Sequence, residues 1–378
     1  MNLVLNLLPA TSGGNLTRAE AFIQRFHTVA PGTKLIILKH PSVLSKYKSN
    51  GHLIICNIPL PLDFLKIFRR LWWENFKMKN FLKNLKPDVY LTFSHSLPFI
   101  NLDMPTIVGV SNLAPFSKEA YKVEPFLIKI KLKILKKTII SSCKKGNTII
   151  ALSKTCKKLL VLEGIPEKKI VVAPNGVDTW WNDHETKDQN ITRDLNKSKF
   201  MLYVSHFHRY KNHINLINAY SKLPKRIVED YSLVLVGRFH DKNYMKDIYK
   251  LIEYKNLKDH IVIFPSQPKE ILRSLYRKTS LFLFPSFIEN CPNILLEAMM
   301  SGSNIISSNI NPMPEFGGDA ASYFDPNEPE SIYRSIMNNL LEFQNKSGIN
   351  YKSIDQAKKY TWDSFTNTIF QEVFRLSK

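Results

Sequence analysis

Short apolar runs alternate with amphipathic stretches along the whole chain, which is the pattern of a parallel α/β protein. Residues 2–8, 34–38 and 88–93 are such runs in the first half, and residues 200–204 and 280–284 are examples in the second. Their lengths suit strands that are buried on both faces of a sheet. The sequence therefore predicts parallel sheets covered by helices, with ligands bound at the loops that follow the strands.

Helices are predicted between these runs. Residues 15–29 carry apolar side chains at helical spacing, and residues 62–85 form a long basic segment that contains two Trp. Residues 118–142 contain few helix-breaking residues, so one continuous helix is expected there. Residues 362–376 are predicted to form the last helix.

The most informative stretch follows the apolar run 280–284 as a loop and then a helix. Pro292 suits the first turn of a helix, residues 294–300 are good helix formers, and Gly302 is typical of a helix end. The loop carries Glu289, and the helix carries Glu297.

A carboxylate can accept two hydrogen bonds from the vicinal diol of a ribose or hexose, and a helix N-terminus favours a phosphate. Together these features describe a nucleotide-sugar site. As an isolated pair, however, Glu289 and Glu297 are better explained as a helix-capping residue and a solvated surface residue.

The surrounding residues favour the nucleotide-sugar interpretation. Residues 284–302 contain Pro-Ser, a Glu, seven residues, a second Glu, Ala-Met and a Gly, and the similarity continues through residues 303–308, 313–315 and 318–326. This pattern closely resembles the signature of glycosyltransferase family 4, the retaining enzymes of GT-B fold. The resemblance implies an α/β protein with two doubly wound parallel-sheet domains facing a central cleft.

The resemblance also implies roles for residues of the donor site. Glu289 would contact the donor sugar and Glu297 the nucleotide ribose. Many family members have Gly or Phe where this chain has Cys291 and Pro292. Because Pro292 has no N–H group, backbone contacts to the sugar are expected from the residues that follow, namely Asn293, Ile294 and Leu295. The loop that begins at Pro265 would line the base pocket.

A basic loop after residues 200–204 is suited to a diphosphate. Lys211 matches the Lys of the family pattern. The family has Arg where this chain has His206, and Arg209 is the candidate for the missing charge. The alternative is that both cations are simply exposed loop residues.

The first half supplies candidates for the acceptor side. Gly13 and Gly14 occupy the place of a Gly-Gly that lines the acceptor and diphosphate cleft in the family. Many members have a His where this chain has Ser111 and Asn112, and Asn112 can still hydrogen-bond a sugar hydroxyl. His95 lies on a neighbouring loop and is a second candidate, although an ordinary loop histidine explains it equally well.

The formal net charge of +21 over 378 residues points to an anionic partner, such as a membrane surface or an acidic substrate. Lys129, Lys133, Lys136 and Lys137 share one face of the helix expected at 118–142, as in helices that lie on membranes. Compositional bias toward Lys, Asn and Ile is the alternative. No nucleic-acid-binding module is visible, so nucleic acid is not expected as a partner.

Other features bound the compartment and the cofactors. The four Cys have neither metal-ligand nor disulfide-framework spacing, which fits a reducing compartment. Residues 1–8 are apolar but lack a charged leader, and no run is long enough to span a bilayer. We expect a cytoplasmic protein, either free or peripheral on the cytoplasmic membrane face. No metal or other cofactor is expected, since no Asp-x-Asp motif follows a strand.

The predicted organisation is an acceptor-binding domain over residues 1–180, a linker over 181–199 and a donor domain over 200–360. Residues 361–378 would return to pack on the first domain. The predicted function is retaining transfer of a sugar from a nucleoside diphosphate sugar to a hydroxyl of a glycan or lipid-linked glycan, in surface polysaccharide or glycolipid assembly. A sugar-nucleotide 2-epimerase of GT-B fold and a non-catalytic, basic nucleotide-sugar-binding protein are the alternatives. Donor base, sugar, acceptor and oligomeric state stay open.

Overall fold

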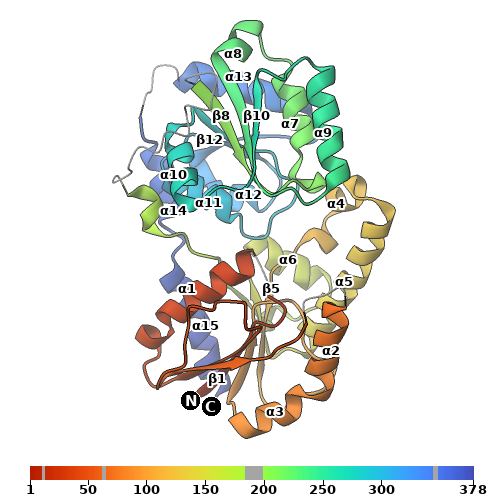
Figure 1. Ribbon diagram of the computed structural model, residues 1–378. Helices are drawn as coiled ribbons and strands as arrows, with labels where there is room; N and C mark the ends of the chain where they lie inside the picture. Colours follow the sequence, from red (N-terminus) through yellow and green to blue (C-terminus); the bar gives the residue numbers. More distant parts are fainter. Residues whose placement is uncertain (11–12, 62–64, 184–198, 344–347) are drawn as a thin grey trace. The chain divides into compact units, whose positions relative to one another are not determined.

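The computed structural model describes residues 1–10, 13–61, 65–183, 199–343 and 348–378 (Figure 1). The chain divides into two compact units, which are described separately here. Unit 1 contains Met1–Phe116, Ile130–Gly176 and Thr361–Lys378, and unit 2 contains Ser117–Lys129 and Val177–Tyr360.

Unit 1 is built on a seven-stranded parallel sheet in the order β3-β2-β1-β4-β5-β6-β7. Most strand residues are buried, because helices cover the sheet. The strands are β1 (Asn2–Asn6), β2 (Lys34–Lys39), β3 (Leu53–Asn57), β4 (Val89–Thr92), β5 (Thr106–Val110), β6 (Thr148–Ala151) and β7 (Ile170–Val172).

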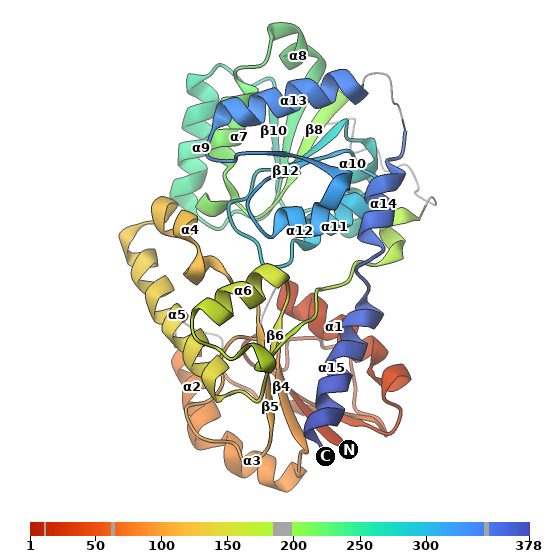
Figure 2. The ribbon, with the colours of Figure 1, turned by 180° about the vertical axis from the view of Figure 1, so that it is seen from behind.

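The helices of unit 1 include the last helix of the chain, α15 (Trp362–Leu376), which packs beside the first, α1 (Gly14–Val29) (Figure 2). The Phe22 and Phe370 rings stack with their centroids 5.2 Å apart. The backbone at Gly176 approaches so closely that a Cβ there would lie 2.1 Å from the Trp362 nitrogen. The other helices are α2 (Lys66–Phe76), α3 (Met78–Leu85), α6 (Lys154–Leu162) and most of α5 (Phe126–Lys145).

Two helices that the sequence predicts as continuous are each divided in the structure. The segment 62–85 forms α2 and α3 with a break at Lys77, and its first residues, 62–64, lie outside the described residues. The segment 118–142 forms α4 (Lys118–Val123) and α5, because Glu124 is extended before Pro125. A residue that precedes proline disfavours the helical conformation, so the single-helix prediction was wrong here.

Unit 2 contains a six-stranded parallel sheet in the order β10-β9-β8-β11-β12-β13. Its strands are β8 (Lys199–Val204), β9 (Tyr231–Val236), β10 (Ile261–Phe264), β11 (Leu281–Phe284), β12 (Ile305–Ser308) and β13 (Ala321–Phe324). Its helices are α4, α7 (His213–Tyr220), α8 (Lys225–Asp230), α9 (Lys242–Tyr254), α10 (Lys269–Lys278), α11 (Asn293–Met300), α12 (Met313–Gly317), α13 (Pro329–Phe343) and α14 (Tyr351–Ala357).

The domain boundaries differ in detail from those expected. Ser117–Lys129 belongs to unit 2 instead of the first domain, and α4 packs against the short helix η5 (Arg209–Lys211) of that unit. The change of unit falls between Gly176 and Val177. Most of the expected linker, residues 184–198, lies outside the described residues.

Strand order reverses at one place in each sheet, between β1 and β4 in unit 1 and between β8 and β11 in unit 2. At such a point the loops that follow the two strands diverge and leave a crevice where ligands bind in open α/β sheets. The loop after β8 contains Lys211, and the loop after β11 contains Glu289. Both predicted donor residues therefore follow strands that flank the reversal.

Candidate functional site

Lys211 and Glu289 form an ion pair where the strand order of unit 2 reverses. The two side chains are only 10% and 14% exposed, so the pair is largely shielded from water. Burial lowers the pKa of Lys211, but the Glu289 carboxylate and Tyr210 raise it, and the result lies above the ordinary value of a lysine. Lys211 is therefore a fixed positive charge with Glu289 as its counter-ion.

Hydrogen bonds hold the two loops in register around this pair. The Tyr203 hydroxyl donates to the Lys211 carbonyl at 2.8 Å, and the Phe287 N–H donates to the Tyr210 carbonyl at 2.9 Å. The buried Asn212 amide donates to the carbonyl groups of Pro285 and Pro326, at 3.1 and 2.8 Å. The position of Lys211 is thus set by neighbours on β8 and on the segments that follow β11 and β13.

Helix α11 begins four residues after Glu289 and offers free backbone donors. The Asn293 N–H is already bonded to the Cys291 carbonyl at 2.9 Å, so it is not available to a ligand in this structure. The N–H groups of Ile294 and Leu295 have no acceptor among the described residues. Of the three expected backbone donors, these two remain, and the helix start favours an anion there.

Glu297 lies in the next turn of α11 and forms a separate cluster with Tyr276 of α10. Burial raises the pKa of Glu297 to about 7, with opposing contributions from Lys269, which lowers it, and Asp178, which raises it. The Tyr276 hydroxyl is buried next to this carboxylate, yet it makes no hydrogen bond of standard geometry. A partly buried carboxylate beside an unsatisfied hydroxyl is a polar site that a ligand hydroxyl could complete.

Arg209 does not point freely toward the predicted diphosphate site. Its guanidinium lies 3.0 Å from a carboxylate oxygen of Asp247 and 3.5 Å from one of Asp241, and it lies over the Tyr244 ring. Two carboxylates thus already compensate its charge. The structure favours a role for Arg209 in joining the loop after β8 to α9.

His206, which replaces the expected Arg, belongs to a cluster of imidazoles. Its ring centroid is 5.1 Å from that of His240, which stacks on His208 at 4.8 Å. Desolvation, and then the charges of His240 and Lys211, lower the pKa of His206 to about 4, although the residue as a whole remains exposed. His206 is therefore a neutral donor or acceptor at pH 7 and does not supply the charge of an arginine.

The rest of this cluster was not predicted from the sequence. His208 and His240 lie on different loops, after β8 and β9, and a parallel bridge between Phe207 and Phe239 brings those loops together. The pKa of His208 is also lowered to about 4, first by desolvation. The sequence signal for this cluster was the pair His206 and His208, which are two residues apart. The third member, His240, lies 32 residues beyond His208.

Pro265, expected near the base, is exposed at the end of β10. The Gln267 amide donates to its carbonyl at 3.1 Å, so the loop folds back on itself before α10 begins. The exposed backbone is available to a planar ring, but within the described residues this loop makes no hydrogen bond or ion pair with Glu297 or Lys211.

The acceptor candidates lie in unit 1, at the carboxyl ends of neighbouring strands. His95 follows β4 and its Nδ1 lies 3.3 Å from the Ser111 hydroxyl, which follows β5. Burial, and then the charge of Arg70, lowers the pKa of His95 to about 4, so the ring is neutral. The side-chain oxygen of Asn112 accepts the Ala114 N–H at 2.9 Å, so the NH2 group is the part of this side chain that remains for a ligand.

Gly13 and Gly14 begin α1 in the same unit. Gly13 has a φ of 72°, a conformation that favours glycine, and both residues are exposed. Arg18 was not predicted as part of the site. It is buried one turn into the helix and donates to the Asn175 side chain at 2.8 Å. This bond connects the start of α1 to the Pro-Asn-Gly segment at residues 174–176. The sequence did not indicate this contact, because Arg18 is a single Arg within a predicted helix.

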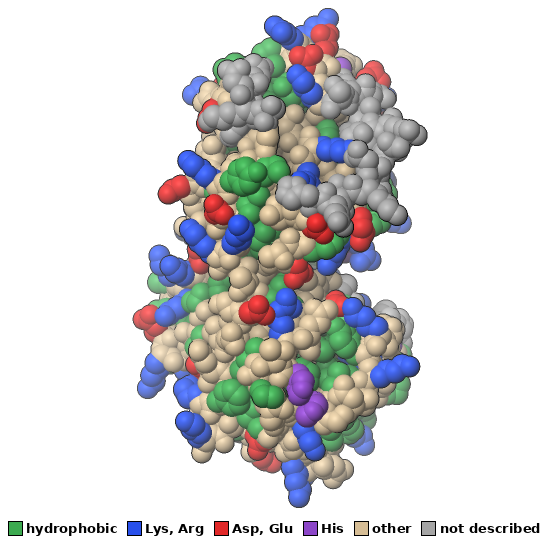
Figure 3. Space-filling model, turned by 90° about the vertical axis from the view of Figure 1, so that its left-hand side faces the viewer, with side chains coloured by type: hydrophobic (Ala, Val, Ile, Leu, Met, Phe, Trp, Pro, Cys, Tyr) green, Lys and Arg blue, Asp and Glu red, His purple; other side chains and the backbone are tan. Residues whose placement is uncertain are grey.

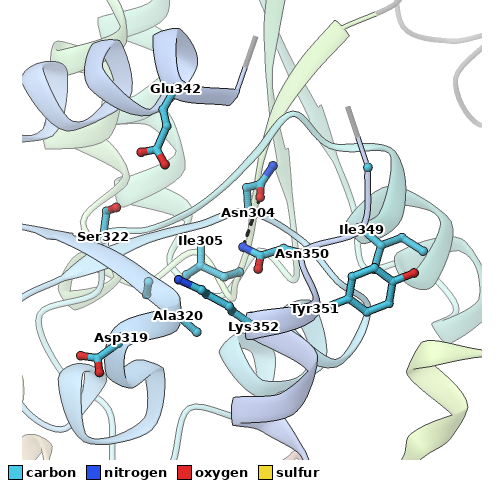
Figure 4. Close-up of a pocket in the computed structure, with 12 residues that line it drawn as sticks. Asn304, Ile305, Asp319, Ala320, Ser322, Glu342, Ile349, Asn350, Tyr351 and Lys352 are labelled. Carbon is cyan, nitrogen blue, oxygen red and sulfur yellow. Dashed lines mark hydrogen bonds between the residues drawn. The ribbon is translucent and has the colours of Figure 1, made fainter. Parts of the chain in front are cut away.

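A cavity of about 420 Å³ opens at the other edge of the unit 2 sheet, next to the amino ends of β12 and β13 (Figure 4). Asn304 and Asn350, joined by a 3.2 Å hydrogen bond, lie in its wall, and Glu342 and Lys352 line its sides. None of the predicted site residues reaches it. The cavity is therefore distinct from the site at the strand reversal.

Among the described residues, no group of three or more His, Cys, Asp or Glu side chains is arranged to hold a metal ion. The same is true of the histidine cluster after β8 and β9, which is not arranged to hold a metal ion. In the same part of the chain, the helices are too short or too polar to cross a bilayer.

Models of known families match both halves of the chain. The model "Glycosyltransferase Family 4" matches residues 27–181, and "Glycosyl transferases group 1" matches residues 184–351. The chain belongs to the group 1 glycosyltransferases of family 4 type, and the predicted family is confirmed.

Relatives agree with this assignment. The chain is 30% identical over 168 residues to O-antigen chain mannosyltransferase B of Escherichia coli, a match that covers 44% of the chain and 43% of the relative. It is 24% identical over 298 residues to the E. coli serotype-specific mannosyltransferase WbdA, covering 74% and 36%. These matches span less than half the length of either relative.

The crystal structure of Anabaena HepE in complex with UDP and glucose matches the whole chain with a TM-score of 0.75 and 14% identity, covering 100% of both chains. A likeness at this identity concerns the fold. With the two parallel-sheet units, it confirms the predicted GT-B fold.

Proposed function

We propose that this protein is a retaining glycosyltransferase that moves a hexose from a nucleoside diphosphate sugar to a hydroxyl of a surface glycan or lipid-linked glycan. The observation that carries the proposal is the shielded Lys211–Glu289 pair, followed closely in sequence by the free N–H groups at the start of α11. Mannose is the first candidate sugar, because two relatives are described as mannosyltransferases of O-antigen or serotype-specific type.

In this proposal, the diphosphate is held by Lys211 and by the N–H groups of Ile294 and Leu295. Negative charge builds on the diphosphate as the bond to the sugar breaks, and a fixed cation in a shielded site stabilises that charge. As the diphosphate takes over Lys211, Glu289 becomes free to accept hydrogen bonds from the sugar. Glu297 accepts the two ribose hydroxyl groups.

Retention follows if the acceptor hydroxyl attacks from the face that the diphosphate leaves. The new bond joins the acceptor oxygen to the anomeric carbon, and the bond from that carbon to the phosphate oxygen breaks. The hydroxyl proton passes to the departing phosphate oxygen, so no protein nucleophile is required. His95, Asn112 and the Gly13–Gly14 turn are proposed as the substrate-contacting residues of unit 1.

No metal takes part in the proposed reaction, and the acceptor is proposed to be met at an anionic membrane surface on the cytoplasmic side. Transfer is expected to be unchanged in EDTA. A loss of activity that Mg²⁺ or Mn²⁺ restores would contradict the metal-independent account.

The test is a panel of nucleoside diphosphates and their sugars in a thermal-shift experiment, followed by transfer to a mannose-terminated glycan. A ligand that binds the native state raises the apparent stability in proportion to the logarithm of its concentration. We expect stabilisation by one base and transfer with the anomeric configuration retained, as read by NMR. Epimerised sugar nucleotide would favour the epimerase, and binding without turnover would favour the non-catalytic protein.

A further inference from the structure

Helix α2 presents large apolar side chains to solvent while it buries a carboxylate. Phe68, Trp72 and Phe76 recur every four residues and therefore share one face of the helix. They are 70%, 53% and 70% exposed, and Ile67 beside them is 55% exposed. We call this surface the aromatic face of α2.

The opposite side of α2 explains this orientation. Glu74 is the one buried residue of this fully described helix, and its carboxylate accepts from the Asn6 side chain at 2.9 Å. Arg70 lies 3.5 Å from the same carboxylate, and Asn6 also bonds the Tyr90 hydroxyl at 2.7 Å. This polar network fixes the rotation of the helix, so the aromatic face cannot turn inward without breaking it.

A neighbouring loop extends the aromatic face. Phe99 is 68% exposed, and its N–H donates to the Asn75 side chain of α2 at 2.6 Å. The Lys145 ammonium of α5 donates to the Phe99 carbonyl at 2.7 Å. On α5, Ile130 and Ile134 are also exposed and lie among the exposed Lys131, Lys133 and Lys137. An apolar surface of this kind marks an interaction site.

Cations surround the aromatic face. Residues 66–86 carry seven Lys or Arg and one carboxylate, the buried Glu74. The Lys77 ammonium lies 5.6 Å from the centroid of the Trp72 ring. On the side of the molecule shown in Figure 3, by contrast, cations are scattered among carboxylates on both units. The surface of α2 therefore combines exposed aromatic side chains with an excess of cations.

We propose that α2 lies in the interface of an anionic bilayer, with Phe68, Trp72 and Phe76 among the acyl chains and the flanking cations at the headgroups. Trp and basic residues are enriched at that depth, and amphipathic helices of this composition lie in the membrane plane. Self-association through the same face would bring like charges of two copies together, which disfavours it. The membrane contact of the proposed function thereby becomes specific, with α2 replacing the lysine face of α5 as the main contact.

The test uses the full chain with vesicles of phosphatidylcholine alone or with phosphatidylglycerol added. Wild type is expected to float with the anionic vesicles, less so at high salt, and to leave the neutral ones largely unbound. The triple variant Phe68→Ser/Trp72→Ser/Phe76→Ser is expected to reduce partitioning at least tenfold. Tyr249→Ser/Tyr254→Ser on α9, which removes aromatic groups that are 52% and 80% exposed, is the matched control and should bind as wild type.

A second readout shows whether α2 itself enters the bilayer. Trp72→Phe keeps an aromatic group, so it should bind vesicles while losing most of the blue shift of Trp fluorescence that accompanies wild-type binding. Wild-type partitioning of the triple variant, or equal binding to both vesicle types, would overturn the proposal. So would wild-type dimers in light scattering that the triple variant abolishes. Nucleoside diphosphate titration of the same variants tests the donor site independently.

Discussion

At the scale of single residues, the proposed donor site depends on charges that the protein holds in place with its own side chains. Lys211 and Glu289 neutralise each other in a shielded place, and Glu297 lies apart in a polar cluster with Tyr276. Lys211 is therefore expected to affect the turnover number, and Glu297 is expected to affect how stability depends on pH.

Lys211→Ala is expected to lower the turnover number by about 10²- to 10³-fold, because one fixed donor to a developing oxyanion is typically worth about 3–4 kcal/mol. The Michaelis constant for the donor should change much less, since the charge is greatest in the transition state. Lys222→Ala, which removes a half-exposed lysine paired with Glu330, is the control. Turnover within a few-fold of wild type, in a variant folded by circular dichroism, would make Lys211 a structural residue.

Glu297 is expected to make stability depend on pH. Because burial raises its pKa from 4.5 to about 7, its contribution to stability is fully present below about pH 4.5 and is lost as the pH rises through 7. Glu297→Gln lacks that loss, so its melting temperature should rise relative to wild type between pH 5 and pH 8. The difference corresponds to about 1–3 kcal/mol.

The control for this pH experiment is Glu328→Gln, which removes the same charge from an exposed position. Its difference from wild type should be nearly constant over the same range. A constant difference for Glu297→Gln as well would show that the carboxylate is not desolvated.

At the scale of elements, the site depends on how closely the strand ends approach one another. Gly237 ends β9 against the loop after β8, and a Cβ at this position would lie 1.7 Å from the Ser205 carbonyl oxygen. The two loops that carry the histidine cluster cannot meet in this way if a side chain separates them. Gly237 therefore supports the geometry of the proposed donor site from outside it.

Gly237→Ala is expected to lower the free energy of unfolding by about 2–4 kcal/mol, in the range of changes that force the backbone to move. Gly32→Ala is the matched control, since a Cβ added at Gly32 would meet no atom within 4 Å. Chemical denaturation of the two variants measures the difference. Equal stability would show that the approach at Gly237 relaxes easily.

The same scale shows what the sequence could predict. Buried parallel strands such as 280–284 were predictable because their apolar runs are local, and α15 was predictable from its periodicity. The break in the segment 118–142 also has a local signal, Pro125, which the single-helix prediction did not take into account. The orientation of α2 was not predictable, because it depends on the contact of Glu74 with Asn6, 68 residues away.

At the scale of the whole molecule, the family and the fold were predictable because the signature of unit 2 is contiguous in sequence. The partners of Arg209 were not, because Asp241 and Asp247 come from another βα unit. The net charge of +21 points to an anionic partner but to no particular surface, and we propose the aromatic face of α2 as that surface. The central claim nevertheless concerns the nucleotide site of unit 2.

That claim is tested most directly by calorimetric titration of the free nucleoside diphosphate into wild type and Glu297→Ala. Each charge-assisted hydrogen bond to a ribose hydroxyl is worth about 1.5–3 kcal/mol, so the variant should bind about tenfold to a few hundredfold more weakly. Glu289→Gln, which alters the proposed sugar contact, should leave nucleotide affinity within a few-fold of wild type while most transfer is lost. Wild-type affinity in a folded Glu297→Ala variant would contradict the assignment of the nucleotide to this site.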